Sequence, residues 1–564
     1  MEIIDFIVGT LKRSPELAIF ASLAIGYWVG GIKFGSFALG SVTGTLLAAI
    51  LIGQLGITVS PNVKSIFFIM FLFAVGYGVG PQFVRGVATD GLPQAIFAVV
   101  VSVLCLLSVY VACIIAGYDA GYGAGLIAGT QTISAAMGLA TDAFNGLGLP
   151  PDQVKALADK MPVAYAVTYI WGTIGTGIIL SILGPKLLGV NMEAECKRYE
   201  KEMSVGAPAG GMQSAYRRLD MRTYKVGDRL PPGTTVRDVE SRLPDARIFV
   251  MRLRRDGKLV NVDQTTVLQQ GDVVAVGGKT EVLVDVLGKF GNEVSDAELL
   301  DVPAEAVDVV LTNKAYDGKT LLELSKSEFA RGVYLNKITR GSTSVNIPIL
   351  AQTKLNRGDI LRIAGPKAFT DAAIKNIGYA DRPTNMTDMI WVGLGIVVGG
   401  LIGALVLPIR GVPITLSTSG GALIAGIIIG WARGVHPTFG RIPAPALWFM
   451  NSVGLNVFIA VVGLTAGPTF VAGIKEAGFE LFLWGLFATS VPMLLAPLIG
   501  KYIFKFDPAI NLGACGGART STASVAMVAD VAKSDIPMLG YTVPYAVSNT
   551  LLTMWGLVIV LMLA

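Results

Sequence analysis

Ten apolar runs with few or no charged residues constrain this chain more than any other feature. A helix needs roughly 20 apolar residues to cross the hydrocarbon core of a bilayer. The runs lie at 17–34, 39–55, 63–84, 92–117, 162–183, 389–409, 414–431, 446–471, 480–503 and 541–563. They predict an α-helical polytopic membrane protein, because in lipid each backbone group must find its partner within the helix.

The composition of the whole chain excludes most other classes of protein. Only 15% of the 564 residues are charged, against roughly 25% in soluble domains. The single histidine, His436, cannot build a metal cluster, and the cysteines Cys105, Cys113, Cys196 and Cys515 form no CxxC pair. We find no Ser/His/Asp set, no P-loop and no basic patch with aromatic platforms. We therefore expect no enzyme activity, no metal or other cofactor and no nucleic-acid partner.

Two further segments, 121–140 and 510–531, are rich in Gly, Ala, Ser and Thr rather than in Leu and Phe. Small and hydroxylated residues suit segments that pack inside the protein or line a cavity. If each segment is a re-entrant hairpin, each half has about five spans, and the second half enters the membrane inverted. If each segment spans, the two halves run parallel. The inverted arrangement is the one that we expect.

The first and last thirds of the chain resemble each other in order. The matching segments are 44–53 with 421–430, 75–84 with 462–471, 129–132 with 517–520, and 163–167 with 543–547. The motif Gly-Pro-x-Phe-Val ends the third run of each half, which apolar bias alone does not explain. A duplicated membrane half is typical of secondary transporters.

Between these halves the charges become dense and the apolar runs shrink to strand length. This insert also reads as a duplication, near 221–290 and 307–377, with Gly-Asp turns at Gly271-Asp272 and Gly358-Asp359. Short β-branched runs between such turns predict small α+β units. We expect a membrane repeat at 1–188, inserted domains at 189–300 and 301–386, and a second membrane repeat at 387–564.

Positive charges at the start of the insert predict its side of the membrane. The residues are Lys197, Arg198, Lys201, Arg217 and Arg218. Because Lys and Arg are enriched in cytoplasmic loops, the inserted module is expected in the cytoplasm.

The second copy in the insert carries Asp-Gly-Lys-Thr-Leu-Leu-Glu-Leu at 317–324 and Gly-Asp-Ile-Leu-Arg-Ile-Ala-Gly at 358–365. This pattern resembles the C-terminal subdomain of potassium-transport regulators, the RCK-C type. A tandem pair of such domains between two membrane halves resembles the aspartate:alanine exchanger family of bacterial inner-membrane antiporters. The resemblance implies exchange of aspartate for alanine, or of a related dicarboxylate such as succinate. It also implies a homodimer in the bilayer, with a module that stabilises the dimer or senses a small ligand.

Arg519 is the strongest candidate for a substrate-binding residue. It lies in an otherwise uncharged stretch, 508–529. An arginine at membrane depth costs from about 2.5 kcal/mol upward, so by default it is functional or paired. Its guanidinium can grip a carboxylate bidentately, and Thr520, Ser521 and Thr522 add hydroxyls. The structural alternatives are an ion pair with Asp530 or Asp142, or a place at the water interface.

The matching segment of the first half offers hydroxyls and an amide but no charge, in Thr130, Gln131, Thr132 and Ser134. Two hairpin tips that meet near the midplane would bind a carboxylate through Arg519 on one side and form hydrogen bonds on the other. The alternative is helix packing by small residues.

Two Gly-Pro motifs and two aspartates complete the candidates. Gly80-Pro81 and Gly467-Pro468 predict broken helices that line a cavity, with a simple kink as the alternative. Asp142 and Asp530 match across the repeat and are candidates for proton coupling, with loop solvation or helix pairing as the alternative.

The sequence therefore predicts an antiporter for small carboxylates or amino acids that works by alternating access, with an elevator motion if the hairpins are re-entrant. One alternative is an ion channel or potassium transporter gated by the RCK-C-like pair, but no TVGYG-like filter is present. The other is a membrane sensor that binds its ligand without moving it.

Overall fold

A computed structural model describes residues 2–34, 37–38, 40–88, 91–203, 219–228, 230–241, 248–260, 262–279, 283–284, 291–302, 304–330, 332–340, 345–381, 386–409, 412–436 and 440–564. Arg217 and Arg218 lie outside these residues. The chain forms two compact units. The first comprises Met1–Tyr199, Arg340–Ile347 and Pro383–Ala564, and the second comprises Glu200–Thr339 and Pro348–Arg382.

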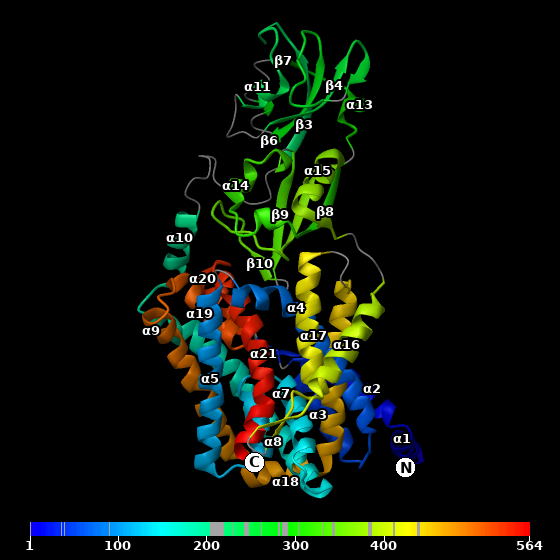
Figure 1. Cartoon of the computed structure of the whole chain (residues 1–564), viewed down its shortest axis with the longest axis vertical. Coiled ribbons are helices and arrows are strands. Elements are labelled where there is room, and N and C mark those ends of the chain that lie inside the picture. Colours follow the sequence, from blue (N-terminus) through cyan, green and yellow to red (C-terminus); the bar gives the residue numbers. More distant parts are fainter. Residues whose placement is uncertain are drawn as a thin grey trace. The chain divides into compact units, whose positions relative to one another are not determined.

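The first unit is a helical bundle (Figure 1). Its helices in the first third of the chain, apart from two hairpin segments treated below, are α1 (Glu2–Arg13), α2 (Pro15–Gly30), α3 (Ser41–Gly53), α4 (Pro61–Ala88), α5 (Leu92–Ala116), α8 (Pro151–Ile178), η1 (Ile179–Leu183), α9 (Gly184–Leu188) and α10 (Met192–Met203). Those of the last third are α16 (Met389–Gly403), α17 (Ser417–Val435), α18 (Ala444–Tyr502) and α21 (Met538–Leu563). Within the described residues, 6 helices are long and apolar enough to cross a membrane. They support a multi-pass membrane protein.

The helix lengths differ from the predicted runs in two ways. The runs at 17–34, 39–55 and 389–409 form α2, α3 and α16, which have only 16, 13 and 15 residues. The runs at 446–471 and 480–503 join into α18, a single helix of 59 residues. At 1.5 Å per residue the path along the axis of α18 is about 88 Å, far more than one bilayer crossing needs. Gly473 and Gly478, between the two runs, do not stop the helix.

The expected helix breaks at Gly80-Pro81 and Gly467-Pro468 are wrong. Helix α4 continues through Pro81 to Ala88, and α18 continues through Pro468 to Tyr502. A proline has no N–H, so the carbonyl four residues earlier loses its usual helical hydrogen bond. Close packing of neighbouring backbones offsets that loss here.

This packing is reciprocal between the two halves of the bundle. The carbonyl of Tyr77, four residues before Pro81, lies so close to Gly430 of α17 that a side chain there would have no room. The carbonyl of Leu464, four residues before Pro468, lies in the same way against Gly53 of α3. Each long proline-containing helix thus packs on a glycine of the opposite half. Such a close approach brings the glycine Cα–H group against the carbonyl oxygen of the proline-containing helix.

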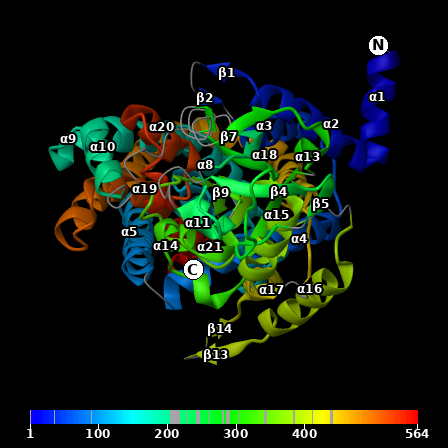
Figure 2. The ribbon, with the colours of Figure 1, turned by 90° about the horizontal axis from the view of Figure 1, so that it is seen from above.

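Each of the two helices that supply these glycines follows a small β-hairpin. Strands β1 (Lys33–Phe34) and β2 (Phe37–Ala38) precede α3, and strands β13 (Leu407–Ile409) and β14 (Val412–Ile414) precede α17. Figure 2 shows the two hairpins at opposite edges of the helical unit.

The insert forms two five-stranded sheets with equivalent strand orders, β5-β4-β6-β3-β7 and β10-β9-β11-β8-β12. Their strands belong to the second unit except for β10 and the last residue of β9, which belong to the first. The strands of the first sheet are β3 (Leu219–Val226), β4 (Phe249–Arg255), β5 (Lys258–Val260), β6 (Val273–Lys279) and β7 (Gly291–Val294). Those of the second are β8 (Ala304–Leu311), β9 (Tyr334–Arg340), β10 (Val345–Ile347), β11 (Ile360–Pro366) and β12 (Gly378–Ala380). Short helices join them: α11 (Val236–Ser241), α13 (Ala297–Leu300), α14 (Leu321–Ser325) and α15 (Lys367–Ile377).

The Gly-Asp turns of the two sheets have the same geometry. Gly271 and Gly358 both have left-handed φ, 92° and 88°. In each turn the aspartate side chain accepts a hydrogen bond from the backbone N–H three residues earlier, at 2.8 Å for both Asp272 and Asp359. The two motifs singled out in the insert therefore occupy equivalent places in two equivalent sheets.

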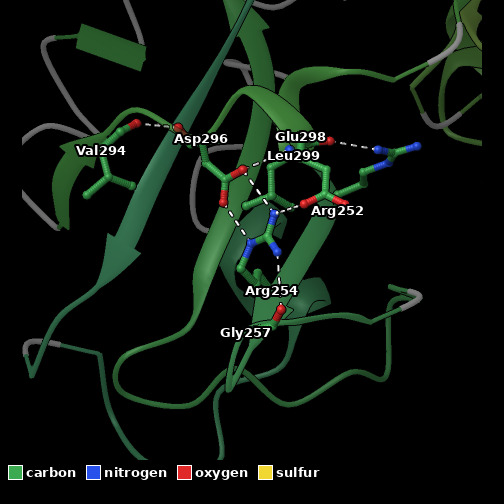
Figure 3. Close-up of polar contacts among 8 residues, drawn as sticks. Arg252, Arg254, Gly257, Val294, Asp296, Glu298 and Leu299 are labelled. Carbon is green, nitrogen blue, oxygen red and sulfur yellow. Dashed lines mark hydrogen bonds and ion pairs between the residues drawn. The ribbon is translucent and has the colours of Figure 1, made fainter.

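The strongest side-chain cluster in the second unit is already neutralised (Figure 3). Arg254 on β4 makes two hydrogen bonds to Asp296, at 2.8 and 3.1 Å, and one to Glu298 at 2.7 Å. These bonds raise the pKa of the Arg254 guanidinium, and Arg254 in turn lowers the pKa of Asp296. Asp296 also caps α13 through the N–H of Leu299, so the cluster fixes that helix against the sheet.

Candidate functional site

Each of the two weakly apolar segments forms two short helices joined by a turn. Segment 121–140 becomes α6 (Ala120–Thr130) and α7 (Ala135–Gly146), and segment 510–531 becomes α19 (Pro508–Ala518) and α20 (Thr522–Ala532). Helices of 11 or 12 residues are about 16–18 Å long, roughly half of a bilayer crossing. We call these the first hairpin (α6–α7) and the second hairpin (α19–α20).

The first hairpin turns back on itself, as its packing on α8 shows. Three glycines of α6 contact α8 in ascending order: Gly121 against Leu157, Gly125 against Met161 and Gly129 against Tyr165. Helix α6 therefore runs parallel to α8. Only four residues join α7 to α8, and such a linker spans at most about 18 Å. Helix α7 must return to the level where α6 begins.

The second hairpin has the same relation to α21. Gly513 lies against Pro537 and Gly517 against Tyr541, so α19 runs parallel to α21. Five residues join α20 to the start of α21, and α20 must therefore return as α7 does.

The two hairpins approach each other along α8 from opposite ends. The first hairpin begins beside Leu157, and its tip lies against Gly172. The second begins near Gly184, which contacts Leu512, and its tip reaches Thr176, whose hydroxyl accepts a 3.3 Å hydrogen bond from Arg519 Nε. Figure 1 shows α19 and α20 in the upper part of the bundle and α7 in the lower part. The contacts of the two tips on α8, at Gly172 and Thr176, are thus about one helical turn apart.

The turns at the two tips have the same backbone conformation. Thr132 and Thr520 both adopt left-handed φ, 53° and 55°. Their N–H groups bond to the carbonyls of Gly129 and Gly517, at 3.1 and 2.8 Å, and the next N–H groups in each turn reach one residue further back. This is a Schellman helix end, where glycine is usual. A β-branched residue there stores roughly 1–3 kcal/mol of strain, a feature that clusters at functional sites.

Arg519 is fully buried at the second tip, with 0% of its surface exposed. Its Nε bonds to Thr176, but Nη1 and Nη2 have no hydrogen-bond partner among the described residues. The alternative readings, an ion pair with Asp142 or Asp530 or a place at the water interface, are therefore not what the structure shows. A buried guanidinium without a counter-ion is strongly destabilising, so the site attracts an anion.

The hydroxyls next to Arg519 have different environments. Thr520 Oγ1 is buried without a hydrogen-bond partner. Ser521 caps α20 through the N–H of Ser524, and Thr522 pairs with the Tyr541 hydroxyl at 2.7 Å. Of the three predicted hydroxyls, Thr520 is the one left for a ligand.

The first tip is buried but uncharged. Thr130 Oγ1 donates to Leu126 O at 2.6 Å, and Ser134 pairs with the Tyr165 hydroxyl at 2.7 Å. Gln131 is fully buried, and its Oε1 has no partner among the described residues, while Thr132 is half-buried. Among the buried side chains described at this tip, the group without a partner is therefore the amide oxygen of Gln131.

The two matching aspartates lie in unlike surroundings. Asp142 is half-buried and lies near Ser417 and Ser419 at the start of α17 and near Lys64. Asp530 is exposed. The structure brings neither to Arg519.

Two buried polar residues of the helical unit received no role in the sequence analysis. Thr176, the partner of Arg519, lies in an ordinary apolar run and carries no signal of its own. Asn549 on α21 is buried as well, and its Nδ2 has no partner among the described residues.

Acidic residues cap the first helix of both hairpins, 388 positions apart in the chain. Asp119 caps α6 and pairs with Lys160 of α8 at 2.5 Å. Asp507 caps α19 and pairs with Arg198 of α10 at 2.6 Å. Lys533, at the end of α20, also pairs with α10, through Glu193 at 3.1 Å.

The helices and this buried cationic tip define a polytopic membrane protein of the transport class. A family model described as "Predicted Permease Membrane Region", from the aspartate–alanine exchanger family, matches residues 18–185 and 391–561. The chain belongs to this family, and it is a transporter.

Its relatives agree with that assignment over nearly their whole length. An uncharacterized transporter of Shewanella oneidensis is 51% identical over 99% of this chain and 100% of its own. Others from Bradyrhizobium diazoefficiens and Zymomonas mobilis are 39% and 33% identical, over 90% and 99% of this chain and 98% and 100% of their own. No solved structure matches the chain.

Proposed function

We propose that this chain is a secondary antiporter that exchanges small carboxylates or amino acids, aspartate for alanine or a related dicarboxylate such as succinate. The observation that carries the proposal is Arg519, which is fully buried with both Nη groups unpartnered beside Thr176. A carboxylate fits this group because it neutralises the charge and accepts two parallel hydrogen bonds. No enzyme activity is needed to explain the site.

The mechanism that we propose is alternating access around the two hairpin tips. Re-entrant hairpins that approach from opposite ends of α8 fit inverted membrane repeats at 1–188 and 387–564. Both hairpin tips contact α8. In an elevator motion the two tips would therefore move together with the substrate that they hold. Asp142 remains a candidate for coupling through its contact with α17; the exposed Asp530 is no longer favoured.

The proposal extends to the insert and to the surroundings of the protein. The two equivalent sheets support tandem RCK-C-like domains at 189–300 and 301–386, placed in the cytoplasm, with a small regulatory ligand. We place the protein in the bacterial inner membrane as a homodimer, as its resemblance to the exchanger family implies.

Counterflow in proteoliposomes tests the proposal. Vesicles loaded with unlabelled aspartate should trap labelled aspartate, and Arg519→Ala should abolish this uptake while the purified protein stays folded. Arg519→Lys keeps the charge without the planar fork and should retain a small part of the activity.

The outcomes separate the rival functions. Unchanged uptake by Arg519→Ala would remove Arg519 from the site. Conductance without saturable counterflow would identify a channel. Binding without trapping would leave a sensor.

A further inference from the structure

The amide of Gln131 has only one consistent orientation. Thr130 Oγ1 lies 2.6 Å from Leu126 O and donates its hydrogen to that carbonyl. The amide atom that lies 3.2 Å from Thr130 Oγ1 must therefore be the donor, Nε2. The reverse orientation would set two acceptors against each other, so Oε1 points away from Thr130.

The orphan oxygen of Gln131 and the orphan nitrogens of Arg519 are complementary but do not meet. The two residues occupy equivalent positions in equivalent turns, and both side chains are fully buried. Oε1 of Gln131 and Nη1 and Nη2 of Arg519 nevertheless have no partner among the described residues. Their tips contact α8 at Gly172 and Thr176, one turn or about 5–6 Å apart. The site thus has a surplus of donors at one tip and of acceptors at the other.

We infer that Gln131 is a specificity-determining residue whose Oε1 accepts a hydrogen bond from the ammonium group of a ligand held by its carboxylate at Arg519. This inference rests on the proposed function. A carboxylate without an amino group would leave Oε1 buried and unsatisfied, which sites of this kind reject strongly. A second carboxylate in that place would face the partial negative charge of Oε1. The site therefore favours amino acids over their counterparts without an amino group.

The test compares ligands that differ only in the amino group. Counterflow in proteoliposomes is measured with aspartate against succinate and with alanine against propionate. The wild-type protein should prefer the amino compound of each pair by about tenfold to a hundredfold, the value of one hydrogen bond to a charged group. Gln131→Met, which keeps the length of the side chain but has no acceptor, should bring this ratio to within about threefold of one, mainly through weaker binding of the amino compound.

Gln82→Met is the matched control. Gln82 is a buried glutamine in α4 whose Oε1 also lacks a partner, and its position is outside both tips. This variant should keep the wild-type ratio. Elution as a single species of wild-type size establishes that both variants are folded.

The results distinguish this inference from the proposed function. Equal affinities within each pair in the wild-type protein, or an unchanged ratio in Gln131→Met, would overturn the role of Gln131 and leave Arg519 as the carboxylate anchor. A wild-type protein that moves none of the four compounds would reject the proposed function and the inference together.

Discussion

The first and second hairpins share a backbone turn and differ in the chemistry that the turn presents. Thr132 and Thr520 have φ angles of 53° and 55°, and the residue before each is fully buried. That residue is neutral Gln131 in one hairpin and cationic Arg519 in the other. The two hairpins thus share a strained turn with a buried polar side chain before it, and that side chain is charged in only one of them.

The hairpins also differ in what holds their outer ends. The first is paired to α8, through Asp119 and Lys160. The second is paired twice to α10, through Asp507 and Lys533. Helix α10 continues into the second unit, where the carbonyl of its last residue, Met203, accepts a hydrogen bond from the N–H of Gln352. The cationic hairpin is therefore the one attached to the helix that leads out of the membrane unit.

The most direct test of the difference between the two tips is to give them the same side chain. Arg519→Gln gives both tips a glutamine and should weaken carboxylate binding at least a hundredfold, because charge-assisted hydrogen bonds contribute about 1.5–3 kcal/mol each. The protein should unfold at an equal or higher temperature than the wild type without ligand, since the variant removes an unpaired buried charge. Ligand titration and thermal unfolding in detergent measure the two effects.

Moving the charge is the control. Arg519→Gln combined with Gln131→Arg should bind carboxylates about tenfold better than Arg519→Gln alone, if the tips are equivalent. No recovery would mean that Thr176, which lies beside the second tip, makes the two positions different.

Replacing the strained threonines should have the next largest effect. Thr132→Gly and Thr520→Gly should each stabilise the protein by about 1 kcal/mol. Glycine adopts left-handed φ without strain, and the relief of strain exceeds the greater loss of backbone entropy that glycine suffers on folding. Equal gains, measured by chemical unfolding, would show that the turns carry equal strain. A gain at only one tip would contradict the equivalence that we describe.

The smallest expected effect is at the outer ends of the hairpins. Asp119→Asn and Asp507→Asn keep the helix cap but remove the charge. Each should lower the free energy of unfolding by about 0.2–1 kcal/mol, and this loss should vanish in about 1 M salt.

At the second hairpin, Lys197 and Lys533 lower the pKa of Glu193 below its ordinary value of 4.5. The stabilisation from Glu193 is therefore complete above pH 4.5 and fades as the pH falls through the lowered pKa.

Unfolding measured against pH checks that last point. The loss of stability at acidic pH should be smaller in Glu193→Gln than in the wild type. An identical acid profile would show that the pairing of α10 with α20 contributes nothing.

Sequence reasoning located the segments that form the site better than it described the helices around them. The match between 129–132 and 517–520 singled out both tips, because a turn that needs particular residues leaves a local trace. Arg519 was recognisable because an arginine in an apolar segment is expensive. Its partner Thr176 was not, since a hydroxyl in an apolar run bonds to its own helix as easily as to a neighbour.

The errors at Pro81 and Pro468 have a tertiary cause. A proline inside a helix costs about 3 kcal/mol in isolation, which argued for breaks. The backbone contacts of Gly430 and Gly53 that accompany these prolines come from the opposite half of the chain and cannot be read locally. Asp142 and Asp530 differ for a similar reason, since contacts with α17 surround only the first.

The reciprocal glycine contacts also set an order of assembly during synthesis. Helix α3 ends at Gly53, but α18, the helix that packs on this glycine, begins about 390 residues later at Ala444. A ribosome that adds roughly 5–20 residues per second needs about 20–80 s to make the intervening chain. Through that interval the nascent N-terminal half must rest in the bilayer with its glycine surface against lipid, and it completes its packing only when translation is nearly finished.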